Sequence, residues 1–296
     1  MRVLISGASG LLGSAIVRAL ETKGAVTTRL VRGSASGNNQ LLWEPGKPLT
    51  LSSPFDAVIH LAGESVVGRW TAAKKARIRY SRVQGTRTLA EAVARMETKP
   101  QVLVAASAIG YYGNRGDEVL TEASPSGTGF LAEICREWEA ASESAERAGV
   151  RVVHIRTGVV LSKQGGALGK MLLPFRLGLG GRLGSGRQWC SWIHVDDIVG
   201  AVLCVLNTDT LRGAVNLVSP NPITNAEFTS ALGTALSRPA ILPAPAFALR
   251  LALGEMADEV LLASQRVQPA QLLASGYGFG FRELGAALAN ILDKPS

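Results

Sequence analysis

The sequence predicts an α/β protein built on a doubly wound parallel β-sheet, with a smaller C-terminal domain on the substrate side. Two observations predict this fold class. Residues 2–6 form a short apolar run typical of a buried strand, and a glycine-rich turn and an amphipathic helical segment reaching Lys23 follow at once. Beyond them, apolar strand-like runs alternate with helical segments, which is the pattern of βαβ units. Sheets of this kind bind ligands at the carboxyl ends of their strands.

Each later element is expected from its own residue pattern. Short apolar runs bounded by turn residues predict strands at 2–6, 26–31, 56–63, 101–107 and 150–156. Apolar residues at helical spacing predict helices at 83–96 and 131–148. Residues 165–187 are rich in glycine and include Lys170, Arg176, Arg182 and Arg187, so we expect a long functional loop there.

The length and composition suit one large domain with a small appended one. The chain has 296 residues, of which 47% are hydrophobic, and can bury a large core. We expect a nucleotide-binding domain at 1–237, which includes the 165–187 loop, and a small helical domain at 238–296 that opens with three prolines.

The turn at residues 7–13 has the G-x-x-G-x-x-G spacing of a dinucleotide-binding, Rossmann-type turn. Glycine lets the backbone turn tightly, approach a pyrophosphate and pack the helix against the strand. Free N–H groups at the positive end of the helix then bind the phosphates. The cofactor contacts expected from this turn are Gly7, Ser9, Gly10, Leu11, Leu12 and Gly13.

The end of the second strand indicates which dinucleotide is bound. An NAD site places Asp or Glu there to bind the ribose 2′-OH, whereas an NADP site supplies Arg for the 2′-phosphate. This chain has Arg32, followed by Ser34, and no carboxylate. The pattern favours NADP(H) over NAD(H), with Arg32 as the phosphate ligand. The alternative is that Arg32 is a solvated loop residue.

Composition argues against several other classes of protein. No apolar run reaches the length of a membrane span, and a strand begins two residues into the chain, so we expect no signal peptide, no membrane partner and a cytoplasmic location. The three cysteines are too widely spaced for a disulfide framework or a zinc site, and no other spacing suggests a metal. The net charge of +8 comes from scattered arginines without interleaved aromatics, which favours anionic ligands over nucleic acid.

Several further motifs carry a resemblance to a known family. Beside the glycine turn, they are His-Leu-Ala-Gly at 60–63, Ser-Ala-Ile-Gly-Tyr-Tyr-Gly at 107–113, Arg-Thr-Gly-Val-Val-Leu at 156–161 and Trp-Ile-His-Val-Asp-Asp at 192–197. With these motifs the chain resembles the extended short-chain dehydrogenases of the nucleoside-diphosphate-sugar epimerase/dehydratase type. The motifs at 130–139, 174–181 and 253–257 are similar to those of an atypical epimerase-like subgroup.

The resemblance covers essentially the whole chain and implies a Rossmann fold with bound NADP(H) or NAD(H). It adds expected cofactor contacts at Leu61, Ala62, Gly63, Glu64, Ser107 and Arg156. It supplies no substrate and leaves a homodimer open.

The catalytic pair of that family is missing here. Its members use a Tyr that exchanges a proton with the substrate and a Lys four residues later on the same helix face. In this chain the Tyr position falls at Phe130 or Leu131 and the Lys position at Ile134 or Cys135. The Arg that grips a sugar-nucleotide phosphate falls at Cys190. These departures argue against ordinary epimerisation of a UDP-sugar.

Ser107, Tyr111 and Tyr112 are the remaining catalytic candidates. Ser107 ends a strand that abuts the nicotinamide end of the cofactor in this fold, and a phenol on the next turn could polarise a carbonyl during hydride transfer. Alternatively, the two tyrosines are packed core residues. His60 and His194 lie in apolar strand contexts and are expected to be structural.

Two functions remain open from the residues. The first is an epimerase-like oxidoreductase that moves hydride between NADP(H) and an unidentified small carbonyl, alcohol or nucleotide-linked substrate. The second is a non-catalytic NADP(H)-binding sensor or regulatory module. The missing Tyr–Lys pair favours the second function, whereas Ser107 and the basic glycine-rich loop favour the first.

Overall fold

A seven-stranded parallel sheet forms the centre of the protein in the computed structural model, which describes residues 1–33, 35, 37 and 39–293. The sheet order is β11-β7-β5-β4-β1-β2-β3. Its strands are β1 Arg2–Ser6, β2 Val26–Val31, β3 Gln40–Leu42, β4 Ala57–His60, β5 Val102–Ala108, β7 Arg151–Thr157 and β11 Gly213–Leu217. The chain runs outward from β1 to β2 and β3, and then returns to β4 on the other side of β1. The sheet is therefore doubly wound, as the sequence predicts, with its switch point between β1 and β4.

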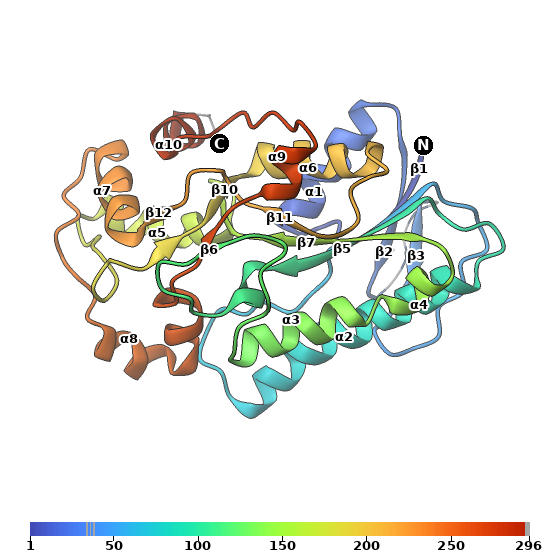
Figure 1. The fold of residues 1–296 in the computed structure, drawn as a ribbon, viewed down its shortest axis with the longest axis horizontal. Coiled ribbons are helices and arrows are strands. Elements are labelled where there is room, and N and C mark those ends of the chain that lie inside the picture. The colour runs from blue at the N-terminus through green and yellow to red at the C-terminus, as the bar shows by residue number, and fades with distance from the viewer. Residues whose placement is uncertain (34, 36, 38, 294–296) are drawn as a thin grey trace.

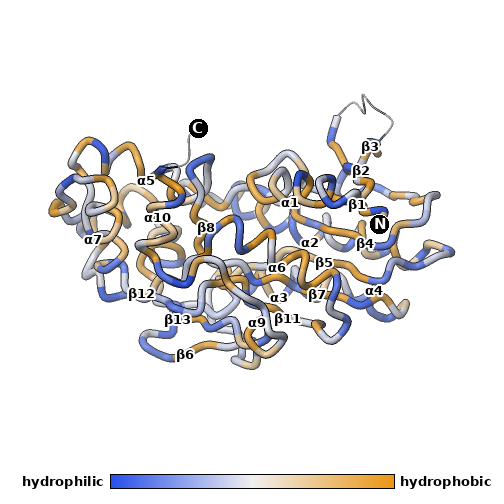
Figure 2. The backbone as a smooth tube through the Cα atoms, turned by 90° about the horizontal axis from the view of Figure 1, so that it is seen from above, coloured by the Kyte–Doolittle hydropathy of each residue, from blue (hydrophilic) through white to orange (hydrophobic). Residues whose placement is uncertain are grey.

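Helices cover both faces of the sheet, so this part of the protein has three layers (Figure 1). One face carries α1 Leu11–Thr22 and α6 Val195–Asn207, and the other carries α2 Ala72–Arg95, α3 Phe130–Ala140 and α4 Glu143–Arg147. Alternate residues of β1 point to opposite faces: Val3 and Ile5 pack in the core with α1 and α6, and Leu4 packs in the core with α2. Figure 2 shows the central strands as hydrophobic segments.

Two helices differ from the sequence-based expectation. α2 begins at Ala72 rather than at residue 83, because its first turns are mostly basic and polar and carry little apolar periodicity. Its N-cap is Thr71, whose side chain accepts a hydrogen bond from the Lys74 N–H. The single helix expected at 131–148 is divided into α3 and α4, with Ser142 at the break. The Ser142 hydroxyl donates to the Glu139 carbonyl and also contacts His154 Nε2, at 2.8 Å in both cases.

The stretch at 165–187 is not a loop throughout, which corrects the expectation from its glycine content. It contains α5 Gly166–Arg176, with Pro174 inside the helix. Gly166 has a φ of +71°, and a side chain there would approach Leu11 of α1. The first turn of α5 therefore packs beside the glycine turn.

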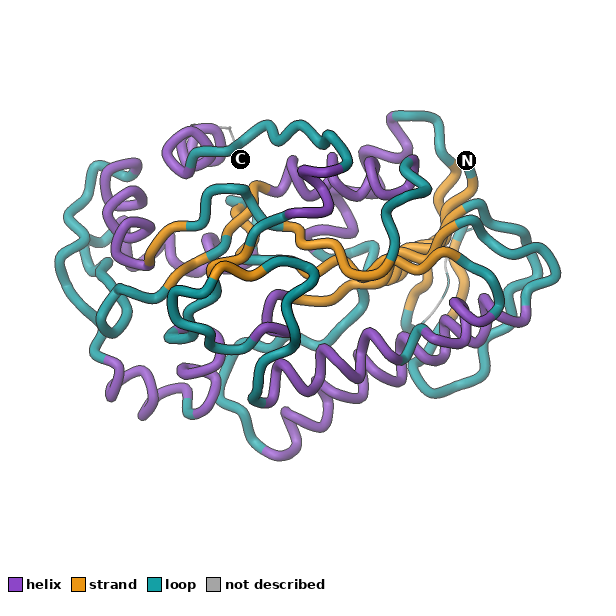
Figure 3. The backbone as a smooth tube through the Cα atoms, viewed as in Figure 1, coloured by secondary structure: helices purple, strands orange, loops and turns teal. Residues whose placement is uncertain are grey.

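The rest of the protein is built from short sheets and helices (Figure 3). Its two-stranded sheets pair β8 Val159–Leu161 with β10 Trp192–His194, β9 Trp189–Cys190 with β12 Ile223–Thr224, and β6 Val119–Leu120 with β13 Arg266–Val267. Its helical segments are η1 Ile109–Tyr112, α7 Asn225–Ala235, α8 Ala246–Leu253, η2 Ala257–Leu261, α9 Ala270–Ala274 and α10 Leu284–Asp293.

The C-terminal helix α10 packs in a hydrophobic core that it shares with earlier segments of the chain. Leu284, Leu288 and Ile291 of α10 pack with Trp192 and Phe228. The Asp197 carboxylate accepts hydrogen bonds from the backbone N–H groups of residues 280 and 281, at 2.7 and 3.0 Å. The segment that leads into α10 is thus anchored to α6. None of the helices in the described ranges has both the length and the apolar character needed to cross a membrane.

Candidate functional site

The glycine turn between β1 and α1 leaves the N-terminal end of α1 without a side-chain cap. Gly7 has a φ of +72°, and a Cβ there would lie 2.8 Å from the backbone carbon of Leu61. A Cβ on Gly13 would lie 2.1 Å from the Gly7 carbonyl oxygen, whereas one on Gly10 would lie 3.3 Å from that oxygen. Gly7 and Gly13 are therefore required for close packing of the turn. Gly10 is the N-cap of α1 and makes no side-chain cap, so the helix N–H groups stay available to a ligand.

A cavity of about 500 Å³ opens beside this turn. Residues from the turn, from the ends of β1, β2 and β4 and from the next segments line it: Gly7, Ala8, Ser9, Gly10, Arg29, Leu30, Val31, Arg32, Gln40, Trp43, Pro45, Leu61, Ala62, Gly63 and Ser81. Seven of the expected cofactor contacts thus share one cavity. Leu11, Leu12 and Gly13 lie in the first turn of α1.

A second cavity, of about 710 Å³, adjoins the first and shares Arg32, Trp43, Pro45 and Ser81 with it. Arg32 is exposed and lies on the common wall, and Ser34, expected to assist it, lies outside the described residues. The buried indole N–H of Trp43 has no hydrogen-bond partner in the described part of the chain. The shared wall therefore offers the guanidinium group of Arg32 to a ligand.

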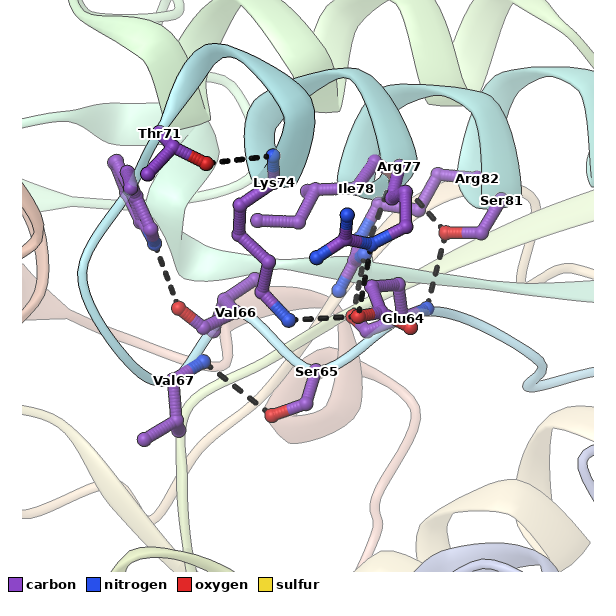
Figure 4. Close-up of polar contacts among 11 residues, drawn as sticks. Glu64, Ser65, Val66, Val67, Thr71, Lys74, Arg77, Ile78, Ser81 and Arg82 are labelled. Atoms are coloured by element: carbon purple, nitrogen blue, oxygen red, sulfur yellow. Dashed lines mark hydrogen bonds and ion pairs between the residues drawn. The ribbon is translucent and has the colours of Figure 1, made fainter.

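Glu64, an expected cofactor contact, lies in the second cavity within a cluster of basic side chains (Figure 4). Its Oε1 atom is 2.7 Å from Lys74 Nζ and 3.8 Å from Arg77 Nε. The hydrogen bond from Lys74 and the charges of Lys74, Arg77 and Arg32 hold the pKa of Glu64 below its ordinary value. Glu64 is therefore an ionised carboxylate at neutral pH.

The backbone of Glu64 is also fixed to α2. Its N–H donates to Ser81 Oγ at 3.0 Å, and its carbonyl accepts from Arg82 Nη1 at 2.8 Å. The segment that follows β4 is consequently held against α2, which places the Glu64 side chain among the basic residues of that helix.

Ser107 belongs to a separate polar cluster at the end of β5. Its hydroxyl donates to Glu139 Oε1 of α3 at 2.6 Å. The same carboxylate accepts from Nε and Nη2 of Arg156 on β7, at 2.8 Å in each case. Burial alone lowers the pKa of Arg156, but the hydrogen bonds and charge of Glu139 raise it above its ordinary value. Arg156, an expected cofactor contact, is thus buried and directed at Glu139.

The two tyrosines of η1 have different surroundings. Tyr112 is fully buried, donates to Asn216 Oδ1 at 2.7 Å and accepts from Arg156 Nη1 at 3.0 Å. Burial raises the pKa of Tyr112. Tyr111 is only partly buried, and the Arg156 guanidinium carbon lies 3.4 Å from its ring centroid. A substrate can therefore reach Tyr111 more readily than Tyr112.

In the family that the chain resembles, the helix equivalent to α3 carries the catalytic pair, but α3 has no proton-transfer pair here. Leu131 lies beside Gly110, and Cys135 Sγ is 3.8 Å from the Ala108 carbonyl, so these two residues face the end of β5. Phe130 instead packs against Trp70, with ring centroids 5.0 Å apart. Burial raises the pKa of Cys135 to about 12, which keeps the thiol protonated.

Both histidines singled out from the sequence are fully buried. His60 Nδ1 is 2.6 Å from Ser6 Oγ, and burial lowers the pKa of His60 to about 4. His194 caps α6, accepting from the Asp196 N–H, and stacks on Phe281. Within the described ranges, the protein groups no three His, Cys, Asp or Glu side chains in an arrangement that could hold a metal ion.

Sequence reasoning missed several residues of these sites, among them Trp43, Lys74 and Arg77. Trp43 follows β3, a strand that was not expected. Lys74 and Arg77 are three residues apart, the spacing of neighbours on one helix face. That signal was hidden because the helix was expected to begin only at residue 83.

Comparison with known proteins gives the family. Residues 3–217 match the model of the NAD dependent epimerase/dehydratase family, and residues 244–291 match a domain of unknown function. An epimerase family protein of Mycobacterium bovis is 44% identical over 298 residues, which cover 99% of this chain and 98% of that protein.

Solved structures agree with this match. The crystal structure of the human epimerase family protein SDR39U1 with NADPH is similar over the full length of both chains, with a TM-score of 0.91 and 36% identity. The UDP-glucose 4-epimerase of Thermus thermophilus in complex with NAD has a TM-score of 0.77 over 99% of this chain and 98% of that one, but at 20% identity it is similar in fold alone. On the strength of the family match and of relatives that are similar from end to end, this chain belongs to the NAD dependent epimerase/dehydratase family.

Proposed function

We propose that the protein binds NADP(H), in preference to NAD(H), across the glycine turn, and that it moves hydride between this cofactor and a small carbonyl, alcohol or nucleotide-linked substrate. The observation that carries the proposal is the cavity that joins the uncapped end of α1 to Arg32. The NADPH bound to the human relative supports it.

The residues of the cavity suit the parts of this cofactor. The N–H groups at the start of α1 would bind the pyrophosphate, and the lack of a side chain at Gly10 gives it room. Arg32 would bind the 2′-phosphate through its guanidinium group. When bound, the cofactor supplies or accepts the hydride.

The proton that accompanies hydride transfer needs a donor in place of the missing pair. Tyr111 is the candidate with access, because its ring is partly exposed and the cationic Arg156 lies against its face. The Ser107 hydroxyl donates its proton to Glu139 and would therefore accept a hydrogen bond from a hydroxyl group of the substrate. Tyr112 holds Arg156 in position, since among the described residues its hydroxyl contacts only Asn216 and Arg156.

The second function, a non-catalytic NADP(H)-binding module, is favoured by one observation. Leu131 and Cys135 occupy the α3 face on which the family carries its proton-transfer pair. Screening carbonyl compounds for NADPH oxidation separates the two functions. If a compound is turned over and Tyr111→Phe lowers that turnover, the result supports the oxidoreductase function. Tight NADPH binding without turnover of any compound supports the non-catalytic module.

Cofactor binding is tested by titrating the protein with NADPH and NADH and following tryptophan fluorescence, to which Trp43 in the cavity wall contributes. We expect NADPH to bind at least about tenfold more tightly, because a charge-assisted hydrogen bond contributes about 1.5–3 kcal/mol. Arg32→Ala should remove most of the difference. Arg95→Ala, at the far end of α2, is the control and should leave it unchanged. Equal affinities for the two cofactors in the unmutated protein would contradict the NADP(H) preference.

A further inference from the structure

The second cavity has an excess of positive charge that the glycine turn does not explain. Arg32 enters it from the end of β2, Arg77 from α2 and Lys47 from the loop after β3. Its carboxylates are Glu44, which pairs with Lys47 at 2.7 Å, and Glu64. Because Lys74 also neutralises Glu64, the charges of Arg32 and Arg77 remain unbalanced among the described groups of this wall.

The two cations on α2 that face Glu64 are held differently (Figure 4). Lys74 is only 15% exposed and makes a hydrogen bond of 2.7 Å to Glu64. Arg77 is 60% exposed, and its closest approach to Glu64 is a 3.8 Å ion pair, longer than a hydrogen bond. Lys74 is therefore a fixed partner of Glu64. Arg77 can turn toward a stronger anion at little cost, since an exposed ion pair contributes about 0–1 kcal/mol.

A phosphate monoester is such an anion. It carries about −1.5 to −2 charges at pH 7 and accepts paired hydrogen bonds from a guanidinium group. Arg32 and Arg77 come from different elements, line the same cavity and both act on the charge of Glu64. A phosphate placed between them would be bound from two sides. The adjacent ion pair of Glu64 and Lys74 has no net charge and would not repel it.

We infer that Arg77 is a second ligand of the adenosine 2′-phosphate and, together with Arg32, determines the choice of NADP(H) over NAD(H). This inference rests on the proposed function and assigns a specificity role to a helix that the glycine fingerprint does not include. The ion pair with Glu64 is the resting position of Arg77, and the phosphate replaces Glu64 as its partner.

Two nucleotides test the inference without the nicotinamide end. Calorimetric titration compares 2′,5′-ADP, which has the 2′-phosphate, with 5′-AMP, which lacks it. Arg77→Ala should lower the affinity for 2′,5′-ADP by about tenfold, which corresponds to the loss of one charge-assisted hydrogen bond. It should change the affinity for 5′-AMP by less than about twofold. The matched control is Arg79→Ala, two residues along α2, where Arg79 pairs with Glu133 and Glu137 of α3. This control should leave both affinities unchanged.

The outcomes separate this inference from the proposed function. If Arg32→Ala removes the preference for NADPH but Arg77→Ala does not weaken 2′,5′-ADP, then Arg77 is no phosphate ligand and the proposed function stands. A loss of equal size for both nucleotides would also overturn the inference, because Arg77 would then support the adenosine or the helix. If the unmutated protein binds none of NADPH, NADH and 2′,5′-ADP, the proposed function itself fails. Melting curves of both variants establish that they remain folded.

Discussion

Glu139 on α3 grips Arg156 on β7 with both of its carboxylate oxygens, at 2.8 Å from Nε and from Nη2. The two side chains are 13% and 5% exposed, so this is a nearly buried ion pair. It connects the Ser107 hydroxyl on one side with Tyr112 and Asn216 on the other. One pair of charges therefore organises the end of β5, where the catalytic candidates lie.

Removing one partner of this pair should be costly. Glu139→Ala leaves a buried guanidinium without its counter-ion, so we expect the free energy of unfolding to fall by about 3–5 kcal/mol. Chemical denaturation measures it. Glu137→Ala, two residues earlier in α3, is the control, because its pair with Arg79 is exposed and contributes about 0–1 kcal/mol. Similar losses of unfolding free energy in the two variants would show that the Glu139–Arg156 pair stabilises the fold no more than an exposed ion pair does.

The two tyrosines of η1 should respond in opposite ways to removal of the hydroxyl. Tyr112→Phe leaves Asn216 and Arg156 each without one contact, so stability should fall by about 1–3 kcal/mol. Tyr111→Phe should leave the melting temperature unchanged and, once a substrate is found, lower turnover by about 10²–10⁴-fold. Turnover that stays within about threefold in Tyr111→Phe, well short of that range, would exclude the Tyr111 phenol as the proton donor.

Two glycines of the turn should separate binding from folding. In Gly10→Ala the added Cβ lies 3.3 Å from the Gly7 carbonyl, a tight but tolerable contact, and projects where the pyrophosphate must approach. We expect a folded protein whose NADPH affinity falls at least about tenfold, the equivalent of 1.4 kcal/mol. In Gly13→Ala the Cβ would lie 2.1 Å from the same oxygen, so the backbone must shift and stability should fall by about 1–3 kcal/mol or more. Fluorescence titration and thermal melting of both variants check this, and unaltered NADPH binding by Gly10→Ala would show that the turn does not contact the pyrophosphate.

His60 should make the protein lose stability in mild acid. Its pKa is about 4 in the fold, because burial disfavours the charged ring, against an ordinary value of 6.5. Between pH 6.5 and 4, His60 is therefore protonated in the unfolded chain but neutral in the folded one. The free energy of unfolding falls as the pH drops through this range, by about 1.4 kcal/mol per pH unit. The lowered pKa of the partly buried His154 adds to the same slope.

The variant His60→Asn isolates this contribution, because the amide can still bond Ser6 but does not titrate. Unfolding free energies measured between pH 4.5 and 6.5, above the range where most carboxylates titrate, should show a shallower slope in the variant. An unchanged slope would mean that His60 is already charged in the fold or titrates normally.

The sequence by itself determined the start of the fold and the side of the sheet on which a ligand binds. The strands expected at 2–6 and 26–31 coincide with β1 and β2. Apolar runs and glycines report on local backbone conformation, so these elements can be read without knowing their neighbours. The bounds of α2 and the break between α3 and α4 could not, because the first turns of α2 lack apolar periodicity and Ser142 bonds to His154 of a later strand.

Only the tertiary structure decided how the charged residues are partnered. Glu139 and Arg156 lie on different elements, as do Glu64 and Arg77, and each pair meets because a helix residue lies beside the carboxyl end of a strand. Burial then separated Tyr112, whose hydroxyl is fully occupied, from its neighbour Tyr111. Local pattern specifies which residues turn, extend or coil, but the electrostatics of a site depend on distances between segments far apart in the chain, and folding alone sets those distances.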